Sequence, residues 1–390
     1  MFSSRVPRQL QVNAFSRALN AARGAGRELI DLTISNPTRT GITYPARLFA
    51  PLSNPDVANY RPEPFGMRSA REAVAADYAR RRVSTTWDRI VLTASTSEAY
   101  SVLFKLLCAP EGDQVLVPAP SYPLFDHLTA LDGVCALQYA LHYDGRWWVD
   151  FDTLDTAWSP RTRAVLAVSP NNPTGSIVSA EEQMALAGRC AARDAALIVD
   201  EVFADYPLSS AADTGSAASA DAPACLRFRL GGLSKSAALP QLKLGWIAVD
   251  GPARLVAEAL ERLELICDTY LSVSTPVQVA APDLIAGGAG PRAEVLERVR
   301  DNYRALVALA LRHPSVDVLN TDAGWSAVIR VAARASEEEI TLGLLEHDSV
   351  VVYPGFFFDF PREAFLVVSL LPEPAQFREG VRRVLERVDG

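Results

Sequence analysis

Three short motifs place an amide, a carboxylate and an amine directly after apolar, strand-like runs. They are Asn-Pro-Thr-Gly at residues 172–175, Asp-Glu-Val-Phe at residues 200–203 and Ser-Lys at residues 234–235. In open α/β sheets, ligands bind at the carboxyl ends of the strands. A lysine at that edge can form a Schiff base with a carbonyl compound, and a carboxylate there can hold a protonated ring nitrogen. Together these groups are the protein's part of pyridoxal-phosphate chemistry.

The elements that must position these motifs alternate between short apolar strands and helices. We expect strands at residues 90–93, 114–118, 164–168, 196–199, 226–230 and 243–249. We expect helices between and around them, at residues 68–82, 97–107, 123–131, 180–192 and 252–266. This alternation predicts an α/β fold with a mostly parallel sheet that is covered on both faces.

The remainder of the chain has the pattern of a smaller α+β unit. We expect helices at residues 8–24, 337–346 and 374–388, a long helix from the Gly-rich stretch 287–291 to 311, and strands near residues 29–34, 316–319, 325–331, 350–352 and 365–370. Residues 209–222 are rich in Ser, Ala, Asp and Gly and predict an exposed loop. We therefore predict a large domain at 45–290, and a smaller domain that combines 1–44 with 291–390.

Composition narrows the class of protein. The 390 residues are 49% hydrophobic and 22% charged, with 38 basic and 46 acidic side chains and a formal charge of −8. This acidic balance argues against nucleic acid and anionic membranes as partners. No apolar run approaches the roughly 18 residues that span a bilayer, and the N-terminal stretch lacks the apolar core of a signal peptide. The five scattered cysteines indicate reduced thiols in a cytoplasmic protein, and the four dispersed histidines have no metal-ligand spacing.

Taken together, these motifs resemble those of the fold-type I pyridoxal-phosphate enzymes, specifically the class I/II aminotransferases related to aspartate and alanine aminotransferases. The likeness extends from about residue 29 to residue 388, with the motifs in the family's order and spacing. It implies a mostly parallel, seven-stranded type of sheet between helices, with a smaller α+β domain. It also implies pyridoxal 5'-phosphate as cofactor, an amino acid or amine and an oxo acid as small-molecule substrates, and a homodimer.

The resemblance assigns a role to each central residue. Lys235 matches the Schiff-base lysine, which can also move the substrate proton, and Asp200 matches the partner of the pyridine nitrogen. Asn172 matches the hydrogen-bond donor to the ring's phenolic oxygen, and Tyr122 matches the aromatic ring that stacks on the cofactor. Considered alone, each of these residues could instead have an ordinary structural role. Lys235 could be a surface lysine, Asp200 a helix cap, Asn172 part of an Asn-Pro turn and Tyr122 a core tyrosine.

The resemblance also predicts the phosphate site. Ser95, Thr96 and Ser97 lie where a strand gives way to a helix, so backbone amides and hydroxyls at a helix N-terminus could bind an anion there, although an ordinary Ser/Thr cap is the alternative. Ser234 is a further phosphate contact. Tyr60 matches the tyrosine that reaches the phosphate of the neighbouring subunit, so the site would be complete only in a dimer.

Four positions depart from the family pattern. Gly232 stands where a serine three residues before the lysine is a further possible phosphate contact. Phe203 stands where a tyrosine usually donates to the phenolic oxygen, which predicts a raised pKa for the cofactor–lysine imine. Lys243 replaces an arginine, so the phosphate would meet a point charge instead of a bidentate guanidinium. Val367 stands where an arginine normally binds the substrate α-carboxylate, which predicts atypical carboxylate recognition.

Either another group receives the substrate carboxylate, or the substrate differs at that point. The candidates are Asn36 and Arg39 in the N-terminal loop that covers the site in relatives, and Arg330 on the strand after Trp325. For each arginine the alternative is an ordinary surface position.

Three functions remain open at the level of sequence. The first is a pyridoxal-phosphate-dependent aminotransferase that acts through Lys235. The second is a lyase or cyclase that uses the same lysine, because reaction type depends on which Cα bond lies perpendicular to the ring. The third is a cofactor-binding domain without catalysis, which the retention of Lys235, Asp200 and Asn172 disfavours.

Overall fold

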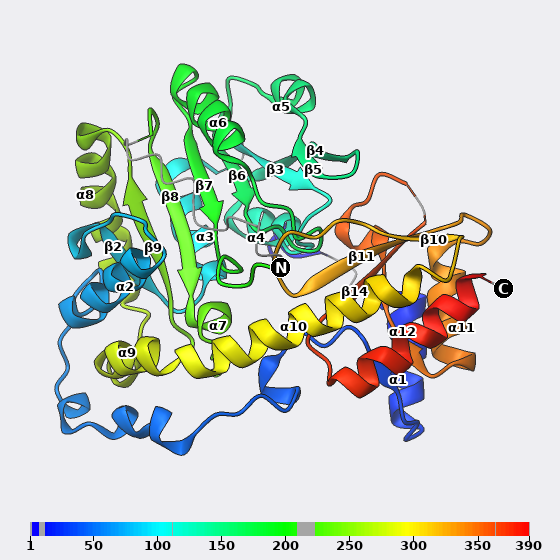
Figure 1. The fold of residues 1–390 in the computed structure, drawn as a ribbon. Helices are drawn as coiled ribbons and strands as arrows, with labels where there is room; N and C mark the ends of the chain where they lie inside the picture. Colours follow the sequence, from blue (N-terminus) through cyan, green and yellow to red (C-terminus); the bar gives the residue numbers. More distant parts are fainter. Residues whose placement is uncertain (1, 8–11, 111, 209–222, 363, 390) are drawn as a thin grey trace.

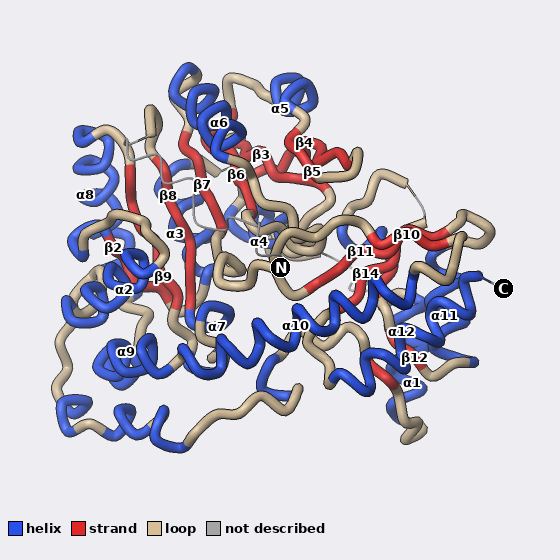
Figure 2. Tube along the Cα trace, in the orientation of Figure 1, coloured by secondary structure: helices blue, strands red, loops and turns tan. Residues whose placement is uncertain are grey.

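The computed structural model describes residues 2–7, 12–110, 112–208, 223–362 and 364–389. The predicted loop at 209–222 lies outside these residues. Within them, eight strands form one large sheet (Figures 1 and 2). In spatial order its strands are β2 (Ile90–Thr93), β9 (Gly245–Asp250), β8 (Arg227–Gly232), β7 (Ala196–Asp200), β6 (Thr162–Val168), β3 (Gln114–Ala119), β4 (Cys135–Tyr143) and β5 (Trp147–Val149).

The centre of this sheet is parallel and its edges are antiparallel. The pairs from β8 through β7, β6 and β3 to β4 are parallel, whereas β9 runs against both β2 and β8, and β5 runs against β4. All five residues of β7 are buried. A strand that is covered on both faces reads as a continuous apolar run, and this is why the sequence of β7 shows no alternation.

Helices cover both faces of the sheet. On one face, the side chains of Val91, Val115 and Ile198 pack with helices α3 (Thr96–Leu107), α4 (Phe125–Asp132) and α8 (Ala253–Tyr270). On the other face, alternate strand residues pack with helices α2 (Arg68–Arg80), α5 (Phe151–Ala157), α6 (Ala180–Ala192) and α9 (Thr275–Gly287). The α/β fold with a mostly parallel central sheet is therefore confirmed.

A second, antiparallel sheet lies beside the first (Figure 1). Its strands, in spatial order, are β10 (Val316–Val318), β11 (Ser326–Val331), β14 (Phe365–Ser369) and β13 (Tyr353–Pro354). One face packs on α10 (Ala289–Ala310) and α12 (Pro374–Asp389), and a short parallel pair joins β1 (Ile30–Asp31) to β12 (Val350–Val351). Helices α1 (Ala14–Gly24) and α11 (Glu337–His347) pack against each other at this end of the molecule. The domain boundaries near 45 and 290 stay a prediction.

Several elements differ from the sequence-based expectation. The large sheet has eight strands where a seven-stranded type was expected, and β4, β5, α5 and α9 were not predicted. Strand β4 mixes exposed and buried residues, and α9 contains Pro282, so neither has the uniform apolar pattern that marks the central elements. Pro291 lies in the first turn of α10, where its missing N–H costs no intrahelical hydrogen bond. Among the described helices, none is long and apolar enough to cross a membrane.

Candidate active site

A cavity of about 660 Å³ opens at the carboxyl ends of β6, β7 and β8. The second sheet closes its other side through residues of β11, β13 and β14. Ten of the predicted cofactor residues line it: Ser95, Thr96, Ser97, Tyr122, Asn172, Asp200, Phe203, Ser234, Lys235 and Lys243. Strand direction explains most of this gathering, because the parallel strands β3, β6, β7 and β8 end at one edge of the sheet and Lys243 precedes the antiparallel β9, which begins there.

Lys235 lies on the short helix α7 (Leu233–Ser236) that follows β8 directly. Its Nζ lies 4.9 Å from the ring centroid of Trp325 and 5.7 Å from that of Phe203, and it makes no hydrogen bond or ion pair with any described residue. Burial lowers the pKa of Lys235 to about 8, and the nearby carboxylate of Asp200 opposes this shift. A desolvated amine near neutrality is the state in which a lysine attacks carbonyl carbons.

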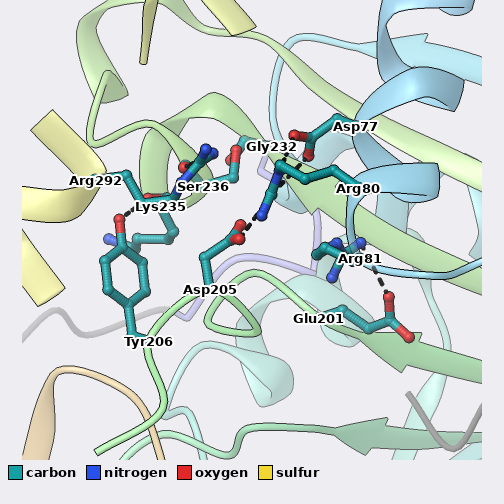
Figure 3. A network of polar contacts seen from close by, with 10 residues as sticks. All are labelled: Asp77, Arg80, Arg81, Glu201, Asp205, Tyr206, Gly232, Lys235, Ser236 and Arg292. Atoms are coloured by element: carbon teal, nitrogen blue, oxygen red, sulfur yellow. Dashed lines mark hydrogen bonds and ion pairs between the residues drawn. The ribbon is translucent and has the colours of Figure 1, made fainter. Parts of the chain in front are cut away.

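The backbone around Lys235 is held from two directions (Figure 3). The hydroxyl of Tyr206 donates a hydrogen bond to the Lys235 carbonyl, and Nη1 of Arg292 donates to the carbonyl of Ser236 at 3.1 Å. The hydroxyl of Ser236 in turn donates to the carbonyl of Gly232 at 3.0 Å. These bonds fix the helix that carries the amine, so its side chain enters the cavity from a rigid base.

Asp200 ends β7 and is buried with two hydrogen-bond donors. The backbone N–H of Val202 donates to Oδ1 at 3.1 Å, and the hydroxyl of Tyr100 donates to Oδ2 at 3.0 Å. The two hydrogen bonds and the positive charge of Lys235 lower the pKa of Asp200, but burial outweighs them and raises this pKa to about 6. Each oxygen keeps a free lone pair, so the carboxylate can still accept a proton donor from the cavity.

Glu201, the residue after Asp200, is paired with two arginines. Arg229 contacts Glu201 at 2.8 Å and Arg81 contacts it at 3.4 Å, all three being largely buried. Arg80 bridges Asp77 and Asp205 alongside them at 2.8 and 2.7 Å (Figure 3). Arg229 and Arg81 offset part of the negative charge of Glu201, which raises the pKa of Asp200.

The Asn-Pro-Thr-Gly turn is fixed by the neighbouring Asn171. Its amide nitrogen donates to Pro120 O at 3.0 Å and to Thr174 Oγ1 at 2.9 Å. Gly175 has a φ of +66°, and a Cβ there would lie 2.2 Å from the Thr321 side chain, so the motif needs glycine at this position. The turn leaves Asn172 at the cavity, where its Oδ1 accepts from Ser326 Oγ at 3.3 Å and its amide N–H groups stay available.

The predicted stacking and phosphate residues also line the cavity. Tyr122 packs edge-on against Phe125, with centroids 6.1 Å apart. Ser95 is the N-cap of α3 and its hydroxyl accepts from the Glu98 N–H at 3.1 Å, so the ordinary cap predicted as an alternative is present. Helix α3 has 12 residues, and the backbone N–H groups of its first turn have no acceptor within the helix. These N–H groups can therefore bind an anion.

The four predicted departures from the family pattern, Phe203, Gly232, Lys243 and Val367, all line the cavity. Phe203 is buried edge-on against Trp325 with centroids 5.5 Å apart, and Lys243 adopts a left-handed backbone conformation with a φ of +50°. Val367 lies at the centre of β14, opposite Tyr353 on β13, and is 2% exposed. The side chain that replaces the family arginine therefore forms part of the cavity wall.

Four predicted residues are not brought to this cavity. Arg330 is a half-buried residue of β11 that pairs with Asp317 at 2.5 Å and does not line the cavity, so the structure does not support it as a substrate contact. Asn36 and Arg39 are exposed, and the Asn36 side chain accepts from the N–H of Thr38 at 3.1 Å as a turn cap. Tyr60 is 74% exposed and lies outside the cavity, and its role toward a partner subunit stays a prediction.

Sequence reasoning missed several residues of the wall. They are Asn13, Thr33, Ser35, Tyr100, Ser326, Tyr353 and Ser369. Tyr100 could have been found, because it lies one helical turn after Ser97 on the predicted helix and so faces the same side. The others come from loops and from the second sheet, and no local signal in the sequence relates those segments to Lys235.

The residues of the cavity fit pyridoxal 5'-phosphate. A buried amine without a partner, a buried carboxylate with free lone pairs, an amide with free donors and a tyrosine ring surround a space large enough for a cofactor and a small substrate. Among the described residues, no group of three His, Cys, Asp or Glu side chains is arranged so that it could hold a metal ion.

Comparisons with known proteins agree with this fit. The family model described as aminotransferase class I and II matches residues 28–384. The chain is 24% identical over 371 residues to the glutamate-pyruvate aminotransferase AlaA of Haemophilus influenzae, covering 92% of this chain and 90% of the relative. It is 28% identical over 330 residues to the valine–pyruvate aminotransferase of Mycobacterium tuberculosis, covering 82% and 81%. The solved structure of alanine aminotransferase from Pyrococcus furiosus superposes with a TM-score of 0.86 at 22% identity, over 99% of each chain. The chain thus belongs to the class I and II aminotransferases and has their fold.

Proposed function

We propose that this protein is a pyridoxal-5'-phosphate-dependent aminotransferase, which moves an amino group between an amino acid and a 2-oxo acid through a Schiff base on Lys235. The observation that carries the proposal is the convergence of Lys235, Asp200 and Asn172 on one cavity, with the lysine amine unpaired. Relatives named for glutamate, alanine, valine and pyruvate support an amino acid and an oxo acid as the substrate pair.

When bound, pyridoxal 5'-phosphate supplies an electrophilic aldehyde and a ring that accepts electrons. Lys235 would hold the cofactor covalently and, once displaced, would carry the proton between the reacting carbons. Asp200 would bind the ring nitrogen and Asn172 the phenolic oxygen, while Tyr122 would fix the plane of the ring. Ser95, Thr96, Ser97, Ser234 and Lys243 would bind the phosphate.

The substrate carboxylate must be recognised without an arginine at position 367. The hydroxyl of Ser35 and the amide nitrogen of Asn172 face the cavity and make no hydrogen bond with any described residue. Both can donate to a carboxylate, but neither carries charge.

The test begins with the cofactor bond. Borohydride treatment of the holoprotein followed by peptide mapping is expected to label Lys235, and Lys235→Ala is expected to lose both the label and turnover. Incubation with an amino acid should convert the bound cofactor to its amine form, and pyruvate or 2-oxobutyrate should restore the starting spectrum. Release of pyruvate and ammonia from the donor alone would instead indicate the lyase alternative. Cofactor binding without any half-reaction would indicate the non-catalytic one.

We further expect a cytoplasmic homodimer in which Tyr60 reaches the partner's phosphate site, with no nucleic acid or membrane as partner. The exposed position of Tyr60 supports a role in an assembly, because a large aromatic side chain at 74% exposure is well placed to be covered by a second subunit. Light scattering and the cofactor affinity of Tyr60→Phe test this expectation.

A further inference from the structure

The cavity offers the substrate no free positive charge. Among the described residues that line it, three carry charge: Asp200, Lys235 and Lys243. If the proposed function holds, all three are engaged by the cofactor, through its ring nitrogen, its aldehyde and its phosphate. The groups left for the substrate are uncharged.

The wall that faces Lys235 from the second sheet is uncharged across its whole width. Val367 lies opposite Tyr353 on the neighbouring strand, and Ser369 lies opposite Ser326, so these four side chains project from one face of the sheet. Phe357 also lines the cavity and packs edge-on against Phe15 at 5.9 Å. Of the two serines, Ser369 donates its hydroxyl to Ile34 O and Ser326 donates to Asn172. The wall is therefore uncharged, and both of its serine hydroxyl hydrogens are already used. The Tyr353 hydroxyl makes no hydrogen bond with any described residue.

Three arginines near this wall are held elsewhere, and the exposed Arg39 does not line the cavity. Arg23 pairs with Asp31 at 2.9 Å, and Arg330 pairs with Asp317. Arg298 lies behind the end of β14, where it donates to Thr40 O at 2.9 Å and to Leu371 O at 3.3 Å. None of these guanidinium groups lines the cavity. A carboxylate against Val367 would consequently be desolvated without a counter-charge, which disfavours its binding there.

We propose that this site selects amino compounds by an apolar substituent held between Val367, Tyr353 and Trp325, and that a substrate carboxylate adds little to binding. The substrate class is then apolar or aromatic primary amines and monocarboxylic amino acids, with the matching aldehydes, ketones and oxo acids. Dicarboxylic donors such as glutamate and aspartate are excluded, because a second carboxylate would have no cation to meet. This inference rests on the proposed function and specifies its substrate.

A pair of donors that differ only in the carboxylate tests the inference on the wild-type holoenzyme. We expect 2-phenylethylamine and L-phenylalanine to convert the bound cofactor with kcat/KM values within about tenfold of each other. We expect L-glutamate and L-aspartate to be at least about a hundredfold poorer than L-phenylalanine. A preference for glutamate, or a loss of more than about a thousandfold on removing the carboxylate, would overturn the inference while leaving the aminotransferase intact. If no donor changes the spectrum, the proposed function itself fails.

Two substitutions of similar length separate charge from shape at the wall. Val367→Lys should raise kcat/KM for L-phenylalanine relative to 2-phenylethylamine by about tenfold or more, since it supplies the missing cation. Val367→Gln has a similar reach without charge and should leave that ratio unchanged. An equal change of the ratio in both variants would show that shape alone determines it, and would overturn the inference. The ratio compares two donors on one enzyme preparation, so partial misfolding of a variant does not alter the ratio. The comparison of donors on the wild-type enzyme tests the inference even if neither variant folds.

Discussion

The hydroxyl of Tyr100 donates a hydrogen bond of 3.0 Å to Oδ2 of Asp200, from a helix that lies across the face of the sheet. Tyr100 also packs edge-on against Phe125 at 5.4 Å, and Phe125 packs edge-on against Tyr122 at 6.1 Å. One aromatic chain thus connects the ring predicted to stack on the cofactor with the carboxylate predicted to bind its nitrogen. We infer that Tyr100 is a positioning residue that acts through Asp200.

Tyr100→Phe removes this hydrogen bond and keeps the ring. The bond stabilises the charged carboxylate, so its loss should raise the pKa of Asp200 further. We expect the acidic limb of the pH–rate profile to move to higher pH and kcat to fall by roughly tenfold, in proportion to one hydrogen bond to a charged group. Tyr139→Phe is the matched control, because the buried Tyr139 hydroxyl donates to Leu166 O at 2.8 Å away from the cavity. Equal shifts in both variants would refute a specific role.

Phe203→Tyr restores the hydroxyl that the family usually places near the phenolic oxygen. A donor to that oxygen stabilises the deprotonated form of the cofactor–lysine linkage. The absorbance midpoint of the bound cofactor should therefore fall by about one pH unit, the effect of one hydrogen bond. Phe203→Leu, which lacks both ring and hydroxyl, should not lower the midpoint. A wild-type midpoint as low as that of Phe203→Tyr would contradict the prediction.

Attachment of the cofactor should depend on the protonation of Lys235. Burial lowers the pKa of this amine from 10.5 to about 8, and only the neutral amine attacks an aldehyde. We expect the rate at which the apoprotein forms the borohydride-trappable bond to rise with pH and to level off above about pH 8. A rate that keeps rising toward pH 10 would show that the amine is not desolvated as described.

Asp200 should destabilise the protein in the absence of cofactor. Its pKa is raised from 3.8 to about 6, so the native state holds its proton more tightly than the unfolded state, and stability falls as pH rises from about 4 to 6. Above pH 6 the full cost, roughly 2 to 3 kcal/mol, is present. Asp200→Asn apoprotein should therefore melt at a higher temperature than wild-type apoprotein at pH 7.5. The difference in melting temperature between the two apoproteins should be smaller at pH 5. A difference that does not change with pH would show that the ionisation of Asp200 is not its cause.

The sequence by itself determined the central part of the fold and which predicted cofactor residues meet at its edge. Strands β6 and β7 are largely apolar runs because both of their faces are buried, whereas β8 also carries Arg227 and Arg229, which pair with Asp250 and Glu201. Each motif residue lies at or shortly after the end of one of these strands. Once strands β6, β7 and β8 are neighbours, Asn172, Asp200 and Lys235 must meet at one edge. This part of the site is local in sequence, so pattern and spacing suffice to predict it.

The substrate wall was decided only by the tertiary structure. Tyr353, Val367 and Ser369 come from short strands far along the chain, and they face Lys235 because the second sheet packs beside the first. The sequence showed that an arginine was missing at 367 but suggested Arg39 and Arg330 as replacements, and neither lines the cavity. An arginine's role depends on which way its strand or loop faces and on which carboxylate it meets, and Arg330 meets Asp317. Ion pairs of this kind join segments that are far apart in the sequence, so the partner of each arginine is determined only by the folded structure.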